Sequence, residues 1–75
     1  MSKLIVKFDV YNDGKFWCGR SFNEDIFTQG STLDELMENI KEAVGLYFDD
    51  IAQKGEELKI ITISELEVPS IAKTT

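Results

Sequence analysis

Four carboxylates in the first third of the chain are of a type that could hold a divalent metal ion: Asp9, Asp13, Glu24 and Asp25. Sites rich in oxygen suit Mg²⁺ or Ca²⁺, and a two-metal nuclease needs several carboxylates that converge on one cavity. The apolar stripe of the predicted helix contributes no acidic residue to such a set, and a turn accounts for Asp13. We predict structural roles for these carboxylates, with a divalent-metal nuclease using Asp9 and Asp13 as the enzymatic alternative.

Nucleophilic and acid–base chemistry has few candidates in this sequence. The chain has no histidine and a single cysteine, Cys18, so no internal disulfide can form. A reactive thiolate needs a base or a positive field, which only Lys15 or Arg20 could supply. A small thiol in the core is the simpler interpretation. The sequence therefore predicts that the protein is not an enzyme and binds no metal or cofactor.

Three aromatic residues around the predicted third strand are the candidate partner-binding residues: Trp17, Phe22 and Phe27. Aromatic side chains are enriched at protein interfaces, although a place in the core is the preferred interpretation for these three. Acidic residues of the helix form first of all a solvated face, and could also steer a basic partner.

The composition sets limits on the partner. The chain has 75 residues, a formal charge of −6 and a sequence pI of about 4.4, and residues 21–57 alone hold two basic and ten acidic groups. Nucleic-acid and anionic-membrane surfaces need clustered Lys and Arg, so neither is expected as a partner. The longest apolar runs are three residues, far below the ~20 of a membrane helix. With one cysteine, these features predict a cytoplasmic domain that gains stability from oligomerisation.

The elements that would position these residues begin with a hairpin. Apolar residues alternate from Leu4 to Val10, which predicts a half-buried strand, and Asn12-Asp13-Gly14 ends it. A second strand follows over 15–21. A two-residue turn would place Trp17 on the face of Val10, whereas a three-residue turn would place Phe16 and Cys18 there. We prefer the three-residue turn, because it buries more apolar surface. Gly19 inside the strand suggests a bulge or a close backbone approach.

A third strand over 26–29, one helix and a final strand complete the predicted fold. Thr32 and Glu35 fit a capping box, an apolar stripe runs from Leu33 to Ile51, and Lys54-Gly55 would end the helix. Close packing on the sheet would explain Gly45 in mid-helix. The strand over 58–66 is apolar on both faces, which indicates a central position or an interface. The fold class is therefore α+β, β-β-β-α-β, with a mainly antiparallel sheet and one helix across one face.

The segment Phe27-Thr28-Gln29-Gly30-Ser31-Thr32-Leu33-Asp34-Glu35-Leu36-Met37-Glu38-Asn39-Ile40-Lys41-Glu42-Ala43 resembles the signature of HicB-type antitoxin domains. In those domains a strand ends in Gly-(Asp/Ser)-Thr and a helix opens Leu-x-Glu and continues Glu-Asn-x-x-Glu-Ala. An acidic hairpin (Asp13-Gly14) and an aromatic strand start (Phe16-Trp17) match upstream, so the similarity covers residues 3 to about 66. It implies one HicB-like domain over residues 1–68 and a flexible tail over 69–75.

The resemblance further implies a partial ribonuclease H-like fold without a nuclease site. Such domains bind and occlude a small basic HicA-type ribonuclease toxin, and they are often dimers or tetramers. Longer members add a DNA-binding segment, and nothing after Pro69 matches it, so no DNA binding by this chain alone is expected. The alternative non-catalytic reading is an orphan domain that forms homo-oligomers through its last strand.

Overall fold

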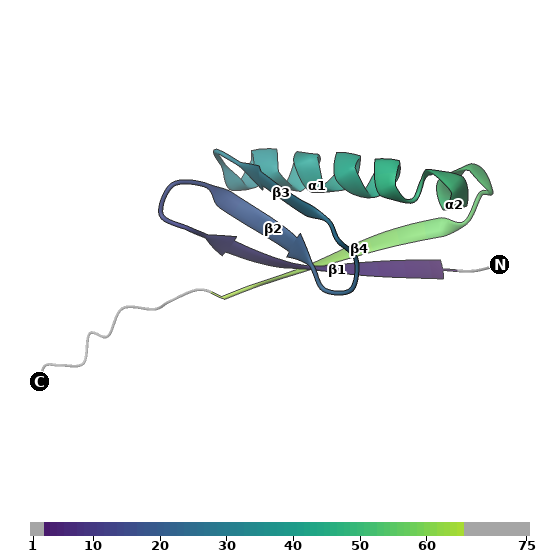
Figure 1. Ribbon diagram of the computed structural model, residues 1–75, viewed down its shortest axis with the longest axis horizontal. Helices are drawn as coiled ribbons and strands as arrows, with labels where there is room; N and C mark the ends of the chain where they lie inside the picture. The colour runs from purple at the N-terminus through teal and green to yellow at the C-terminus, as the bar shows by residue number, and fades with distance from the viewer. Residues whose placement is uncertain (1–2, 66–75) are drawn as a thin grey trace, which may run out of the picture.

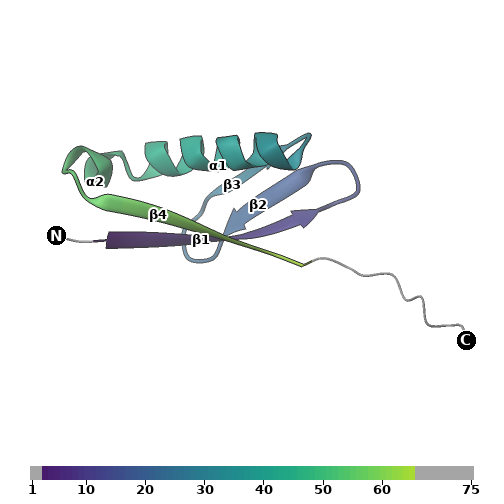
Figure 2. The ribbon, with the colours of Figure 1, turned by 180° about the vertical axis from the view of Figure 1, so that it is seen from behind.

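A computed structural model describes residues 3–65 of the chain and has an α+β architecture (Figure 1). Its elements, in chain order, are β1 (Lys3–Asn12), β2 (Trp17–Ser21), β3 (Phe27–Gly30), α1 (Leu33–Tyr47), α2 (Asp49–Gln53) and β4 (Glu57–Ser64). The four strands form one sheet in the order β3-β2-β1-β4. Both helices lie on the same side of the sheet, as the view from behind also shows (Figure 2). The predicted β-β-β-α-β class is confirmed.

The sheet is mixed. The pairs β1–β2 and β2–β3 are antiparallel, whereas β4 runs parallel to β1, with Leu4 opposite Leu58 and Val6 opposite Ile60. β3 and β4 lie at opposite edges, so the segment between them must cross the whole sheet. A parallel connection of this kind requires a crossover, and α1 and α2 provide it.

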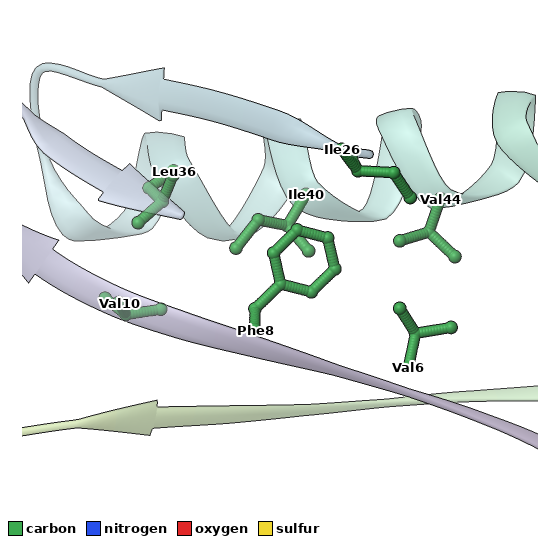
Figure 3. Close-up of a cluster of buried hydrophobic side chains, with 7 residues drawn as sticks. All are labelled: Val6, Phe8, Val10, Ile26, Leu36, Ile40 and Val44. Carbon is green, nitrogen blue, oxygen red and sulfur yellow. The ribbon is translucent and has the colours of Figure 1, made fainter. Parts of the chain in front are cut away.

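The core lies between the sheet and α1, and Figure 3 shows the side chains that form it. Alternate residues of β1 point toward the helix, as the period of a strand requires. They meet helix residues spaced four apart, which lie on one face of α1. The buried residues of this cluster are Val6, Phe8, Val10, Ile26, Leu36, Ile40 and Val44.

The register of the first hairpin corrects one prediction. Val10 lies opposite Gly19 and Asn12 lies opposite Trp17, so Trp17 shares the face of Val10 and the preferred placement of Phe16 and Cys18 there is wrong. The turn residues explain this register, because the Asp13 carboxylate accepts hydrogen bonds from the N–H groups of Lys15 and Phe16. Asp13 N–H also donates to Phe16 C=O at 3.0 Å, which puts Gly14, at φ +99°, and Lys15 at the tip.

Two glycines are needed where α1 approaches the sheet. A Cβ on Gly19 would lie 3.0 Å from Ile40 Cδ1, which confirms the predicted close approach. At Gly30 a Cβ would lie 2.7 Å from the backbone nitrogen of Leu36. The explanation offered for Gly45 is wrong, because it is exposed and a Cβ there would meet no atom within 4 Å.

The helix begins as predicted but is interrupted. Thr32 Oγ1 accepts a hydrogen bond from Glu35 N–H at 3.1 Å, and the Glu35 carboxylate accepts one from Ser31 N–H at 2.6 Å. Phe48 leaves helical geometry at φ −109°, ψ 37°, which separates α1 from α2. The 15 residues of α1 span about 22 Å, whereas the ten residues of β1 span about 33 Å. Because β4 starts beside Lys3, at the far end of β1, α2 supplies the remaining length.

The chain enters β4 through a turn at Gly55, which has φ +77° as a helix-ending glycine requires. β4 ends at Ser64, so the predicted end of the strand at Leu66 and the predicted tail over 69–75 lie outside the described residues. The strand is at the edge of the sheet, not at its centre.

Candidate interaction surfaces

The outer side of α1 carries an acidic stripe, which we define as Asp34, Glu38 and Glu42. The three residues are exposed and follow at four-residue steps, so they lie along one face of the helix. Lys41 is the one basic residue within α1 and α2, and its ammonium group lies 2.9 Å from the Glu38 carboxylate. Asp49 and Asp50 extend the acidic surface at the start of α2. The stripe would attract a basic partner.

The opposite side of the sheet is not covered by any element of residues 3–65, and we call it the open face (Figures 1 and 2). Side chains along a strand point alternately to the two faces of a sheet, and the residues of β1 and β4 on the helix side are even-numbered. The odd-numbered residues of both strands therefore point to the open face. Large apolar side chains are exposed on this face by between 39% and 55%: Ile5, Phe22, Phe27, Ile61 and Ile63.

The three predicted partner-binding aromatics do not form one cluster. Trp17 is half-buried, shares the helix side of the sheet with Val10 and packs against the core. Phe27 lies opposite Arg20, on the open face. Phe22 N–H donates to Lys7 C=O at 2.9 Å, which extends the β1–β2 register by one pair and places Phe22 beside Lys7 on the open face. The structure therefore brings Phe22 and Phe27 to one surface and separates Trp17 from them.

The carboxylates considered as metal ligands have other surroundings. The Asp13 carboxylate is occupied by two backbone N–H groups of its own turn, and these hydrogen bonds lower the pKa of Asp13. Asp9 lies on β1 between Arg20 and Ile63. Within residues 3–65, no group of three or more acidic or cysteine side chains converges as a metal site would require.

Cys18 is buried, and its thiol lies 3.8 Å from Phe16 C=O. Burial, together with the negative charge of Asp13, raises the pKa of this thiol. A raised pKa disfavours the thiolate, which is the nucleophilic form. Cys18 is therefore a buried thiol, but it lies opposite Tyr11, on the side of the sheet away from the core predicted for it.

Comparison with known proteins adds one relative. A UPF0150 protein from Thermotoga maritima is 40% identical to this chain over 52 residues, which cover 69% of the chain and 74% of the relative. The chain belongs to the UPF0150 family. No family model matches it, and no solved structure matches it.

The surface of this UPF0150 domain contains two depressions. A groove of about 420 Å³ runs between α1 and β4, lined by Met37, Ile40, Lys41, Leu58, Lys59, Ile60 and Thr62. A second depression of about 340 Å³ lies near the hairpin, lined by Asp9, Val10, Tyr11, Asn12, Trp17 and Glu65. Both are open to solvent. Among the described residues, no helix is long and apolar enough to cross a membrane.

Sequence reasoning found parts of the open face of the UPF0150 domain but not the surface as a whole. The apolar residues on both faces of the last strand indicated an interface, and Phe22 and Phe27 were candidates on their own. Ile5 gave a weaker signal, an isoleucine on the otherwise polar face of β1. What joins these residues is the parallel pairing of β4 with β1, which local patterns do not reveal.

Proposed function

We propose that this protein is a HicB-like antitoxin domain that binds and occludes a small, basic HicA-type ribonuclease toxin. Two observations support the assignment to this class. The helix start carries the HicB-like residue pattern, with the cap formed by Thr32 and Glu35. The UPF0150 relative matches the chain over 52 residues, so the family similarity extends well beyond this helix start.

The observation that carries the proposal is the acidic stripe on α1. Like charges four residues apart destabilise a helix by about 0.2–0.5 kcal/mol for each pair, and the stripe contains two such pairs, Asp34–Glu38 and Glu38–Glu42. Lys41 offsets a small part of this charge. A basic partner that covers the stripe would relieve the repulsion and would be drawn to it from a distance.

Binding, and not turnover, is the proposed activity. The toxin's cationic surface, which must contact RNA phosphates, would be covered by carboxylates of the antitoxin. This mode of inhibition needs no catalytic group in the antitoxin and places the contact on the helix side of the sheet. Homo-oligomerisation, the other predicted role, would use the open face and is compatible with it.

The test is co-purification of the chain with the basic product of a neighbouring short gene, followed by charge reversal. Glu38→Lys with Glu42→Lys should weaken the complex at least ~100-fold at low salt, because two attractive contacts become repulsive. Asp25→Lys with Glu65→Lys is the matched control, since it changes the net charge from −6 to −2 in the same way. Equal weakening by both pairs would refute a specific role for the stripe, and a lack of any complex would refute the function.

A further inference from the structure

We propose that the open face binds a short single-stranded RNA, whose phosphates lie along a row of cations and whose bases lie on a parallel row of apolar side chains. The proposal does not rest on the proposed function, because α1 and its acidic stripe lie on the other side of the sheet (Figures 1 and 2).

The chain separates its charges between the two sides of the sheet. The strand positions of the open face hold four basic and two acidic residues, a net charge of +2 in a chain of −6: Lys3, Lys7, Arg20, Lys59, Asp9 and Glu57. Within residues 3–65 the one ion pair joins Lys41 to Glu38, so no ion pair there neutralises the basic side chains of this face. The open face would therefore attract an anion, although the composition of the whole chain argues against one.

Three neighbouring pairs across the strands repeat one pattern, a cation beside an apolar side chain. The pairs are Lys59–Ile5, Lys7–Phe22 and Arg20–Phe27. The three apolar side chains are exposed by between 45% and 55%. Each pair thus presents to solvent one positive charge and, next to it, one apolar surface.

The pairs follow one another diagonally across the sheet. Lys59 is level with Ile5, and Lys7 lies two residues farther along β1. Arg20 is level with Asp9, two residues beyond Lys7. Strands lie about 4.8 Å apart and alternate residues lie about 6.7 Å apart along a strand, so successive pairs are about 8 Å apart.

The diagonal produces two parallel rows, which we call the cation row (Lys59, Lys7, Arg20) and the apolar row (Ile5, Phe22, Phe27). Asp9 and Glu65 lie on the far side of the cation row from the apolar row. The carboxylates nearest the cation row are therefore separated from the apolar row by the cations.

A single-stranded nucleic acid has the same arrangement, because a line of phosphates runs beside a line of bases with a comparable repeat. The phenyl rings of Phe22 and Phe27 can each stack one base. Arg20 can hold a phosphate through two parallel hydrogen bonds. A duplex hides its bases, and an acidic peptide or a lipid surface would not use the register of the two rows. The geometry therefore favours a single strand of about three nucleotides.

Gln29 favours RNA over DNA at the end of the cation row. It lies opposite Cys18 on β3, which continues the diagonal by one step beyond Arg20, and it is exposed. Its side-chain amide both donates and accepts hydrogen bonds, as the ribose 2′-hydroxyl does. Only RNA offers this hydroxyl group.

Fluorescence anisotropy of a labelled eight-nucleotide oligouridine, titrated with the full chain at low salt, tests the cation row. We expect a Kd of about 10–500 µM and a plot of log affinity against log salt with a slope of about −2, because three phosphates are neutralised. Lys7→Gln should make this slope less steep by about 0.7. Lys54→Gln is the matched control, since it also changes the net charge from −6 to −7 and Lys54 lies after α2.

Alanine substitutions in the same titration test the apolar row. Phe22→Ala and Phe27→Ala should each weaken binding at least about 5-fold, because each removes a stacked ring. Tyr47→Ala is the matched control, since Tyr47 is an aromatic residue of α1 that is 53% exposed. Circular dichroism establishes that each variant folds, and Lys7→Gln still tests the site if a phenylalanine variant does not.

The remaining probes separate RNA from other occupants. An oligodeoxyuridine of the same length should bind more weakly than the RNA, and Gln29→Leu should remove the difference. Equal binding of RNA and DNA by the wild type overturns the choice of RNA. The site itself is overturned by the absence of binding at about 1 mM chain, by a Tyr47→Ala effect as large as that of Phe27→Ala, or by equally tight binding of a polyglutamate peptide. Self-association of the free chain that Phe27→Ala abolishes would show that a second copy covers the open face, and it also overturns the site.

Discussion

At the scale of single residues, glycine substitutions separate packing from conformational preference. Gly30 is required by its surroundings, because its missing side chain lets the start of α1 approach β3. Gly45 has no comparable neighbour and lies exposed in mid-helix. The same residue type therefore has opposite consequences at two positions, and sequence alone did not distinguish them.

We predict that Gly30→Ala destabilises the fold by about 1–3 kcal/mol, since the new Cβ would lie 2.7 Å from Leu36 N and the helix would have to move. Gly45→Ala should instead stabilise it by about 1 kcal/mol, because alanine is the better helix former. Urea unfolding at neutral pH measures both free energies of unfolding. If both substitutions changed the free energy of unfolding in the same direction, the different roles given to Gly30 and Gly45 would be wrong.

The stability of the first hairpin depends on pH through the carboxylate of Asp13. Backbone N–H groups of Phe16 and Lys15 donate to its carboxylate and lower its pKa below the ordinary value of 3.8. A lowered folded-state pKa adds stability that is complete above the unfolded-state pKa and is lost as the pH falls through the folded-state value. The contribution of Asp13 is therefore present at neutral pH and lost in acid below about pH 4.

The measurement is the difference in free energy of unfolding between the wild type and Asp13→Ala as a function of pH. We expect this difference to be largest near neutral pH and to shrink on acidification to about pH 2. Asp25→Ala removes the same charge outside the turn and controls for the loss of one carboxylate. A difference for Asp13→Ala that grows in acid would contradict the role of the carboxylate.

At the scale of elements, α1 is fixed at its start by a cap and along its length by its buried face. Asn39 adds a link to the sheet, since its side-chain amide donates to Gln29 C=O of β3 at 2.8 Å. Thr32 satisfies one of the backbone N–H groups that a helix start leaves without partners. The crossover therefore depends on local hydrogen bonds at the same end where Gly30 permits close contact.

Replacement of Thr32 by alanine should lower the free energy of unfolding by about 1 kcal/mol, because Glu35 N–H loses its acceptor. Thr32→Ser keeps a hydroxyl at the cap and should stay within about 0.5 kcal/mol of the wild type. Thermal unfolding followed by circular dichroism compares the three proteins. If the Thr32→Ala and Thr32→Ser proteins had the same free energy of unfolding, the hydroxyl group at the cap would not stabilise α1.

At the scale of the whole molecule, the chain separates two kinds of surface on opposite sides of one sheet. The helix side holds the acidic stripe, whereas the open face holds four of the basic residues and most of the exposed apolar side chains. A partner at one surface would leave the other accessible. Substitutions on the two surfaces therefore test them separately.

We expect Ile63→Lys, on the open face, to leave the complex with a basic partner intact, as measured by light scattering coupled to size-exclusion chromatography. Glu38→Lys with Glu42→Lys should release the partner. Loss of the partner on Ile63→Lys would show that the surfaces are not independent.

Local patterns in the sequence determined most of the elements of this protein. The alternation in β1, the capping pair Thr32–Glu35 and the helix-ending Gly55 each act within a few residues, so their signals can be read directly. The hairpin register was harder to predict from buried apolar area. Hydrogen bonds that backbone N–H groups of the turn donate to the side chains of Asn12 and Asp13 favour the observed register instead.

Tertiary structure alone decided which residues share a surface. Ile5 and Ile63 are 58 positions apart, and they lie on the same face of the sheet because β4 pairs in parallel with β1 at its edge. The break at Phe48 has the same origin, since the length of β1 sets where the crossover must end. Pairing between distant strands depends on the packing of the whole chain, and a local sequence pattern carries no record of it.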